Sequence, residues 1–387
     1  MNVLVTDGEQ RAALAIVRSL GRAGHRVNVC AARSRSLAGA SKYCAAHERV
    51  PDPLHKPEAF AAAVEELAAR WAADVILPVS EPALLAILPV RERFAPARIP
   101  FPSYDSFRRI SDKALVAEAA ERVGIRIPAQ RVLAAPPDAV DGIRFPLVVK
   151  PSRSVAEGDG ERIKLSVAFA DDAVALGRIL AEMPRGAYPL LLQERIDGPG
   201  VGVFLLVRGS RVVAAFAHRR IREKPPAGGV SVYRESAHLD PGLLERSRAL
   251  LAEFGWEGVA MVEYKLDAAG TPYLMEVNGR FWGSLQLAID AGVDFPRLLV
   301  EGAEANGAPP PWRVGVRSLW EWGDVDHLIA RLCRSARELA LPPGAPGRAR
   351  AVADFLRALG PGSRNEVLRA SDPAPFIRET VDWLHRR

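Results

Sequence analysis

The sequence predicts an α/β domain with a doubly wound parallel sheet, then an α+β region, then a mainly helical C-terminal extension. Strand-like and helix-like segments alternate over residues 2–100, which is typical of parallel sheets. Residues 146–300 contain strand-like runs separated by short turns, as in antiparallel pairs. After Pro311 the segments are mostly helical. The 387 residues suffice for two or three domains. We expect the parts to span residues 1–105, 106–190, 191–304 and 305–387.

In the first part, Val3–Thr6 is a short apolar strand, and Arg11–Gly24 has helical spacing and ends at glycine. Strand, helix and strand follow at His25–Cys30, Pro57–Trp71 and Asp74–Val79. The first turn lacks Gly-x-Gly-x-x-Gly, so the sequence does not support a nicotinamide dinucleotide site.

Four polar residues directly follow these strands: Thr6, Asp7, Ser80 and Glu81. Loops at the carboxyl ends of parallel strands commonly bind ligands. The same residue types also serve as helix caps and turn residues, and this alternative stays open.

Composition excludes several classes of protein. Hydrophobic residues make up 49% and charged residues 25%, an ordinary balance for a globular enzyme. We see no membrane-length apolar run, no signal peptide, and three widely spaced cysteines, and therefore expect a cytoplasmic protein without membrane contacts. The net charge is +6, but the arginines are scattered, so we expect no nucleic-acid partner.

The most informative segment is a predicted β-hairpin, with its turn at Asp267–Gly270. Glu276, Asn278 and Arg280 alternate along the second strand and therefore share one face. If Leu266 pairs with Thr271, Glu263 lies opposite Leu274 and diagonal to Glu276.

Two carboxylates and an amide oxygen form a ligand set suited to Mg²⁺, which Mn²⁺ could replace, and a guanidinium suits a phosphoryl or carboxylate group. The alternative is a solvated polar face. The apolar neighbours Met261, Leu274, Met275, Val277, Phe281 and Trp282 argue against it, because charges in apolar surroundings need partners.

Upstream, Lys150 ends the apolar strand Pro146–Lys150, and Lys113 begins a helix after Asp112. The loop Pro151–Gly160, which contains Ser154, has small residues that could bring backbone N–H groups close to phosphates. A lysine that reaches water and an ordinary hairpin loop are the simpler interpretation.

Two further segments are candidates. Gln193 and Glu194 follow an apolar strand and could face the edge of a purine, or merely emerge into solvent. The basic run His218–Ser231 is either a surface loop or a lid that presents Arg220 or Arg222 to an anionic reactant.

The order of these elements resembles the ATP-grasp ligases over about residues 1–300. It is most similar to predicted carboxylate–amine ligases that also resemble biotin carboxylase and the large subunit of carbamoyl-phosphate synthase. The resemblance implies an α/β domain followed by two α+β ATP-grasp lobes that clamp ATP.

The resemblance also implies a role for each candidate residue. Lys113 and Lys150 would contact ATP phosphates, Gln193 and Glu194 would line the adenine pocket, and Arg280 would stabilise the transferred group. The residues Glu263, Glu276 and Asn278 would hold one or two Mg²⁺ ions. One departure is Gly198–Gly202, where many relatives have an acidic residue for the ribose.

These implications predict an ATP-dependent ligase that converts a carboxylate into an acyl phosphate and joins it to an amine, with release of ADP and phosphate. The alternatives are ligation to a thiol, carboxylation, or a catalytically silent nucleotide-binding protein. The region after Pro311 is not part of the core of this family, and we expect either an oligomerisation element or a substrate element there.

Overall fold

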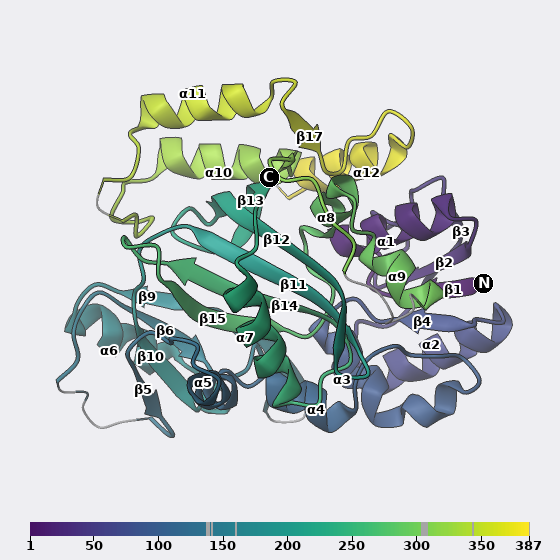
Figure 1. Cartoon of the computed structure of the whole chain (residues 1–387), viewed down its shortest axis with the longest axis horizontal. Coiled ribbons are helices and arrows are strands. Elements are labelled where there is room, and N and C mark those ends of the chain that lie inside the picture. Colours follow the sequence, from purple (N-terminus) through teal and green to yellow (C-terminus); the bar gives the residue numbers. More distant parts are fainter. Residues whose placement is uncertain (137–139, 141, 159–160, 303–308, 343, 387) are drawn as a thin grey trace.

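We describe the protein from a computed structural model. It describes residues 1–387 except 137–139, 141, 159–160, 303–308, 343 and 387. Figure 1 shows the N-terminal domain on the right, a small antiparallel lobe at the lower left and a large sheet in the centre. The C-terminal helices lie across the top of this view.

The N-terminal domain is built on a four-stranded parallel sheet with the order β3-β2-β1-β4. Its elements are β1 (Asn2–Val5), α1 (Arg11–Arg22), β2 (Arg26–Ala31), β3 (Cys44–Arg49), α2 (Pro57–Arg70), β4 (Val75–Leu77), α3 (Glu81–Ile87) and η1 (Leu88–Phe94). The chain runs outward to β3 and then crosses back to β4. Right-handed crossovers therefore place α1 and α2 on opposite faces of the sheet, as the doubly wound prediction requires. The edge strand β3 was not predicted.

The small lobe contains an antiparallel sheet with the order β5-β10-β6-β9 and a separate hairpin, β7-β8. Two helices lead into it, α4 (Tyr104–Ile110) and α5 (Lys113–Arg122). Its elements are β5 (Gln130–Leu133), β6 (Leu147–Pro151), β7 (Val155–Gly158), β8 (Glu161–Lys164), β9 (Ala168–Ala170), α6 (Ala173–Glu182), η2 (Arg185–Ala187) and β10 (Leu190–Glu194). The boundary expected between residues 190 and 191 thus falls inside β10, whose residues pair with β5 and β6.

The large lobe contains a seven-stranded sheet with the order β15-β14-β11-β12-β13-β16-β17. Its elements are β11 (Gly200–Arg208), β12 (Arg211–Lys224), β13 (Val230–Ser236), α7 (Pro241–Ala252), β14 (Gly258–Leu266), β15 (Pro272–Asn278), α8 (Leu285–Ala291) and α9 (Phe295–Glu301). The C-terminal extension adds β16 (Arg317–Leu319), α10 (Glu321–Cys333), α11 (Arg348–Ala358), β17 (Ser363–Asn365) and α12 (Ala374–Leu384). The extension is mainly helical, as predicted, yet its two strands complete the sheet of the large lobe. The boundary expected at residues 304 and 305 lies outside the described residues.

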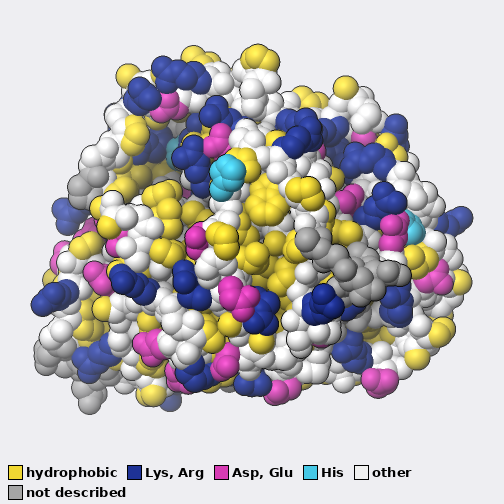
Figure 2. Space-filling model, in the orientation of Figure 1, with side chains coloured by type: hydrophobic (Ala, Val, Ile, Leu, Met, Phe, Trp, Pro, Cys, Tyr) yellow, Lys and Arg dark blue, Asp and Glu magenta, His cyan; other side chains and the backbone are white. Residues whose placement is uncertain are grey.

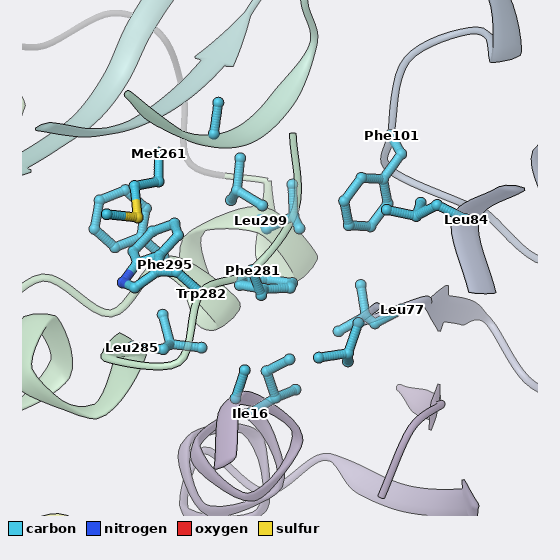
Figure 3. Close-up of a cluster of buried hydrophobic side chains, with 14 of the residues drawn as sticks. Ile16, Leu77, Leu84, Phe101, Met261, Phe281, Trp282, Leu285, Phe295 and Leu299 are labelled. Carbon is cyan, nitrogen blue, oxygen red and sulfur yellow. The ribbon is translucent and has the colours of Figure 1, made fainter. Parts of the chain in front are cut away.

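The core joins the N-terminal domain to the large lobe. Figure 3 shows Ile16, Leu77, Leu84 and Phe101 facing Phe281 and its neighbours from the large lobe. The small lobe instead has its own cluster, formed by Leu133, Leu147, Val149, Ala170, Leu176, Ala187, Leu190 and Leu192. Apolar burial therefore fixes the first and third parts of the chain together and leaves the small lobe as a separate packing unit.

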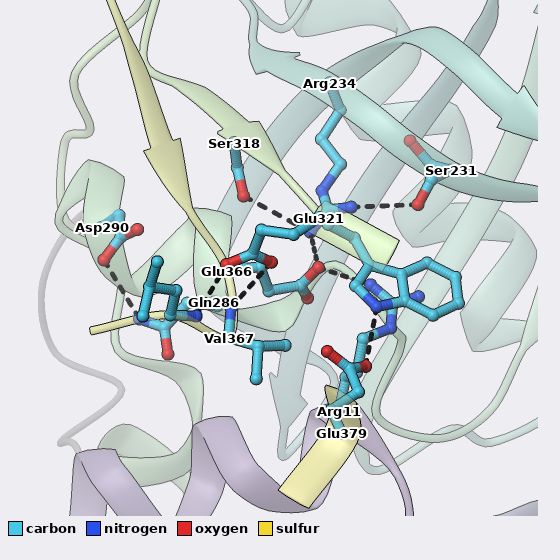
Figure 4. Close-up of polar contacts among 12 residues, drawn as sticks. Arg11, Ser231, Arg234, Gln286, Asp290, Ser318, Glu321, Glu366, Val367 and Glu379 are labelled. Atoms are coloured by element: carbon cyan, nitrogen blue, oxygen red, sulfur yellow. Dashed lines mark hydrogen bonds and ion pairs between the residues drawn. The ribbon is translucent and has the colours of Figure 1, made fainter. Parts of the chain in front are cut away.

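Buried ion pairs hold the C-terminal extension against the N-terminal domain and the large lobe (Figure 4). Glu366 pairs with Arg11 of α1 at 2.5 Å and also with the fully buried Arg234 of β13. Arg18 of α1 pairs with Asp372 at 2.8 Å, and both side chains are almost completely buried. Since an unpaired buried charge is costly, these contacts hold the extension in one place.

The surface agrees with the scattered charge seen in the sequence. On the face shown in Figure 2, acidic side chains are interspersed among the basic ones. Within the described residues, no helix has the length and apolar character needed to cross a membrane.

Candidate active site

A cavity of about 640 Å³ lies between the sheet of the small lobe and the sheet of the large lobe. Eight predicted site residues line it: Lys150, Gln193, Glu194, Arg220, Glu263, Glu276, Asn278 and Arg280. Lys113 and Ser154 line a smaller hollow that shares Glu276, Asn278 and Arg280 with the cavity. The fold thus brings ten of the eleven predicted residues together, from segments up to 167 positions apart in the sequence.

The hairpin of β14 and β15 differs from the predicted register. Leu266 pairs with Pro272, and a bulge then inserts Met275, so that Glu263 lies directly opposite Glu276. The predicted pairing of Leu266 with Thr271, with Glu263 opposite Leu274, is therefore wrong. A bulge re-aims side chains, and here both Met275 and Glu276 line the cavity.

Three residues of β15 and its end form a hydrogen-bonded row. Asn278 Nδ2 donates to Glu276 Oε1 at 2.9 Å, and Arg280 Nη2 donates to Asn278 Oδ1 at 3.0 Å. Burial opposes ionisation of Glu276, but Lys113, the bond from Asn278 and Lys150 outweigh it and lower the pKa of this carboxyl. Glu276 is therefore a carboxylate in the row.

Arg280 is held by hydrophobic anchors on its C-terminal side. Phe281 packs edge-on against Phe101, with ring centroids 6.3 Å apart, and Trp282 packs against Phe204 at 4.4 Å. The Arg280 guanidinium donates to Asn278 and to the Phe281 carbonyl. Within the described part of the chain it forms no ion pair with a carboxylate, so it can receive an anion.

Glu263 receives a guanidinium from the neighbouring strand. Arg220 Nη2 lies 2.5 Å from Glu263 Oε2, and Arg220 Nη1 lies 2.7 Å from Glu223 Oε1. Burial raises the pKa of Glu263 to about 6 despite Arg220, and the nearby charge of Glu276 acts in the same direction. Two carboxylates thus face each other across the strands at an energetic cost that a cation would relieve.

The glycines of β11 explain how Arg220 reaches this carboxylate. A Cβ on Gly200 would lie 2.8 Å from Arg220 Cδ, and a Cβ on Gly202 would lie 2.9 Å from the His218 ring. Both side chains come from β12 and need this space. The segment Gly198–Gly202, where the sequence lacks an acidic residue, therefore makes room for basic residues.

The two lysines approach Glu276 from the small lobe and from α5. Lys113 Nζ lies 4.0 Å from Glu276 Oε2 and donates to Ser154 Oγ at 3.2 Å. Lys150 is 9% exposed, and its Nζ lies 3.9 Å from Met275 Sδ. Burial lowers the pKa of Lys150 to about 8. The described residues provide no hydrogen bond from its ammonium group to oxygen.

The loop after Lys150 is only partly described. Val155–Gly158 and Glu161–Lys164 form a small hairpin. The end of the predicted phosphate loop, residues 159–160, lies outside the described residues. Ser152 O accepts from Lys113 N at 2.8 Å, which joins the loop to the start of α5.

Gln193 and Glu194 contribute polar groups to the wall of the cavity, which also contains apolar side chains. Gln193 Nε2 donates to Gln130 Oε1 at 2.6 Å, whereas the buried Gln193 Oε1 has no partner among the described residues. The Glu194 side chain is exposed and lines the cavity. The apolar residues that line the cavity include Val148, Val167, Phe169, Ile196, Met261 and Met275.

Arg222 is the predicted residue that the structure does not bring to the cavity. The register of β12 against β13 shifts on both sides of Arg222, which turns its side chain away from the face that carries Arg220. Its guanidinium binds Asp324 in α10 through two hydrogen bonds, of 2.6 and 2.7 Å. Both interpretations of His218–Ser231 as a loop or lid need correction too, because β12 extends to Lys224 and β13 begins at Val230.

The four polar residues in the loops of the N-terminal domain were considered either as ligand-binding residues or as turn and cap residues, and the structure contains examples of both positions. Asp7 accepts from Ser80 Oγ at 2.6 Å and from Val79 N at 3.1 Å, and Ser80 caps α3. These residues therefore act as turn and cap residues. Glu81 instead lines the smaller hollow with Lys113 and Arg280, and burial raises the pKa of its carboxyl.

Several lining residues were not given a role in the sequence analysis. Lys164 and Lys265 were not named there at all, whereas His218, Glu223 and Lys224 appeared only within the basic run and Trp282 only as an apolar neighbour. An alternation signal exists for His218, two residues before Arg220 on the same strand. Lys164 and Lys265 carry no such signal, because their position depends on how the lobes pack.

Comparisons with known proteins give one match in sequence. A family model described as "ATP-grasp in the biosynthetic pathway with Ter operon" matches residues 187–321. No curated protein matches the chain in sequence.

Three solved structures illustrate the likeness in fold. An L-amino acid ligase from Bacillus licheniformis has a TM-score of 0.61 and 20% identity, over 80% of this chain and 75% of that one. A biotin carboxylase complex from Campylobacter jejuni has a TM-score of 0.62 and 16% identity, over 82% and 74%. The biotin carboxylase domain of a 2-oxoglutarate carboxylase from Hydrogenobacter thermophilus, in complex with MgADP, ADP and bicarbonate, has a TM-score of 0.61 and 17% identity, over 82% and 73%. In sequence, residues 187–321 thus match an ATP-grasp family model, and over about four fifths of its length the chain is similar in fold to these three solved structures.

Proposed function

We propose that the protein is an ATP-dependent ligase that activates a carboxylate as an acyl phosphate and joins it to an amine, with release of ADP and phosphate. The observation that carries the proposal is the convergence of Lys113, Lys150 and Arg280 on the paired carboxylates of Glu263 and Glu276. Phosphoryl transfer needs positioning and charge neutralisation more than covalent chemistry from the protein. This set of groups supplies both.

The nucleotide would lie along the cavity with its base toward the small lobe. The unpartnered Gln193 Oε1 and the Glu194 carboxylate offer acceptors to an adenine amino group, between apolar walls. The ammonium groups of Lys150 and Lys113 would meet the phosphates, with Ser154 beside them. A buried lysine without an oxygen partner is well suited to this role, because an anion would stabilise its charged form.

A divalent cation fits the other side of these phosphates. Within the described residues, no three or more His, Cys, Asp or Glu side chains cluster as a metal site. Mg²⁺ bound with a nucleotide needs only one or two carboxylates, because phosphate and water oxygens complete its shell. Glu263, Glu276 and Asn278 would hold one or two Mg²⁺ ions, which would neutralise charge on the phosphates. Relief of the repulsion between the two opposed carboxylates supports this assignment.

The amine is proposed from the contrast between Arg280 and Glu81. The Arg280 guanidinium suits the substrate carboxylate, and it suits the phosphoryl group that this carboxylate would take from ATP. The Glu81 carboxylate reaches the same hollow from the N-terminal domain and suits an ammonium group. One of the proteins similar in fold is an L-amino acid ligase, and an amino acid carries both a carboxylate and an amine.

In the proposed reaction, a carboxylate oxygen of the substrate attacks the γ-phosphorus of ATP and ADP leaves. The amine nitrogen then attacks the acyl carbon, and phosphate leaves with the bond electrons while the nitrogen loses a proton. Arg280 and the two lysines would hold the oxygens on which negative charge develops.

The test is ADP release from purified protein, screened over pairs of carboxylates and amines, with thiols as competing acceptors. We expect amine-dependent ADP release that Glu276→Gln abolishes, and that the exposed-site control Glu245→Gln preserves. Equal ADP release by the wild type and folded Glu276→Gln would refute the metal assignment. ADP release that requires a thiol, and proceeds with no amine, would replace the proposal by thiol ligation.

A further inference from the structure

The helix α10 packs against the strand β12. Arg222 binds the fully buried Asp324 through two hydrogen bonds, and its Nη1 donates to the Asp354 carbonyl of α11 at 3.2 Å. The guanidinium also lies over the Tyr233 ring, 4.5 Å from its centre. An arginine held on three sides has no freedom to act as a mobile catalytic group.

The next two residues of β12 are held by the same helix. His327 Nδ1 lies 2.6 Å from the Glu223 carbonyl, and Lys224 pairs with Asp326. Asp326 also accepts from Trp383 Nε1 of α12 at 2.9 Å. Three consecutive residues of β12 thus contact α10, and we call this set of contacts the α10 clasp.

Arg220 connects the α10 clasp to Glu263, one of the proposed metal ligands. The Glu223 side chain, whose backbone is fixed by His327, accepts from Arg220 at 2.7 Å. Arg220 in turn pairs with Glu263 and donates to the Gly229 carbonyl in the turn between β12 and β13. Movement of the end of β12 would therefore move both Glu263's partner and the cavity wall at Ala227–Gly229.

The clasp is supplied by a segment beyond the matched family region. The family model ends at residue 321, whereas Asp324, Asp326 and His327 follow it. The contacts are thus a property of this chain's extension, for which the resemblance implied no role.

We propose that the α10 clasp is a positioning element of the active site, with Asp324 as its principal residue. It holds the end of β12 so that Arg220 keeps Glu263 in place for a metal–nucleotide complex, and keeps the Ala227–Gly229 turn against the cavity. The proposal rests on the proposed function for its ligand, MgADP or MgATP, but the contacts themselves do not. Asp324 acts through Arg222 and touches no reactant.

The test compares Asp324→Asn with Asp354→Asn, which changes the same residue type on the neighbouring helix but keeps the carbonyl that Arg222 uses. Backbone amide hydrogen exchange of residues 221–231 reports the hairpin, and titration with ADP, with and without Mg²⁺, reports the site. In Asp324→Asn we expect exchange of this segment to rise about tenfold, with no change in β1–β4. We expect MgADP affinity to fall about fivefold or more and metal-free ADP affinity to stay unchanged. Asp354→Asn should behave as the wild type in both assays.

A folded Asp324→Asn protein with unchanged hairpin exchange would overturn the clasp. Faster exchange with unchanged MgADP affinity would overturn its link to the site. If the wild type binds no MgADP, the proposed function fails and the ligand part of this proposal fails with it, while the exchange result still decides the clasp. If Asp324→Asn does not fold, Asp326→Asn breaks a more exposed contact of the clasp, and it should shift both measurements in the same direction by less. Asp326→Asn identical to the wild type in both would refute the proposal.

Discussion

Replacement of Lys150 by methionine should make the protein more stable and its nucleotide binding weaker. The ammonium group is buried at the end of β6, close to Met275 Sδ and without an oxygen partner among the described residues. Burial lowers its pKa from 10.5 to about 8, in spite of the opposing attraction of Glu276. Methionine has a similar length and fills the same space without a charge.

The size of the effect follows from this pKa. At pH 7 the lysine is charged in both the folded and the unfolded chain, so the full difference of 2.5 pKa units opposes folding. At about 1.4 kcal/mol per unit, the cost is about 3 kcal/mol. As the pH rises through the window from 8 to 10.5, the folded protein loses the proton first and the cost is released. At pH 9.5 about 1.5 kcal/mol remains.

Urea unfolding at pH 7 and at pH 9.5 measures both values, with the exposed-lysine variant Lys56→Met as control. We expect Lys150→Met to exceed the wild type by up to about 3 kcal/mol at pH 7, and by about half of that at pH 9.5. The control should stay within about 0.5 kcal/mol of the wild type at both. The same variant should bind ATP more weakly. A folded Lys150→Met protein with the stability of the wild type at both pH values would show that the lysine is not strained, and unchanged ATP affinity would remove it from the proposed site.

Three further predictions concern the framework around the site. Asp372→Ala should destabilise the protein by about 3–5 kcal/mol in urea unfolding, because Arg18 stays buried without its carboxylate. The control Glu66→Ala removes an exposed ion pair and should cost less than about 1 kcal/mol. Similar losses of stability in the two variants would contradict the argument. Gly202→Ala should cost about 1–3 kcal/mol of stability, because the new Cβ would lie 2.6 Å from the Phe204 ring. Gly177→Ala in helix α6, where a Cβ would meet no atom within 4 Å, should be neutral or stabilising. Thermal unfolding compares the two variants, and a neutral Gly202→Ala would refute the close contact. Burial raises the pKa of Glu379 from 4.5 to about 7, so the folded protein binds this proton more tightly and loses stability as the pH rises through 4.5–7. In urea unfolding, Glu379→Gln should therefore be more stable than the wild type by up to about 3 kcal/mol at pH 8 and equally stable near pH 4. A stability difference that stays constant with pH would show that titration of Glu379 is not the cause.

Much of the fold could be predicted because it depends on local patterns. The alternation of apolar segments gave α1, α2 and the strands they connect, each within a few residues of its position in the structure. The edge strand Cys44–Arg49 could not be predicted in this way, since half of its residues are polar, none is fully buried, and polar and apolar residues do not alternate along it. Its pairing with β2 comes from the backbone, which carries no side-chain signal.

The candidate site divides in the same way. Glu276, Asn278 and Arg280 share a face because strand geometry dictates it, and this could be predicted from their spacing. The bulge at Met275 could not, because a one-residue insertion depends on how two strands fit against the lobes around them. The same holds for Arg222, which two register shifts turn from the cavity toward Asp324, 102 residues away.

The sequence by itself determined the order of the elements, the residue types available for a phosphate and metal site, and the resemblance to ATP-grasp proteins. Tertiary structure alone decided that Glu263 faces Glu276, that Glu81 joins the site from the N-terminal domain, and that the C-terminal extension holds β12. The physical reason is range: hydrophobic periodicity and turn chemistry act over a few neighbouring residues, whereas these contacts depend on the packing of parts that are far apart along the chain.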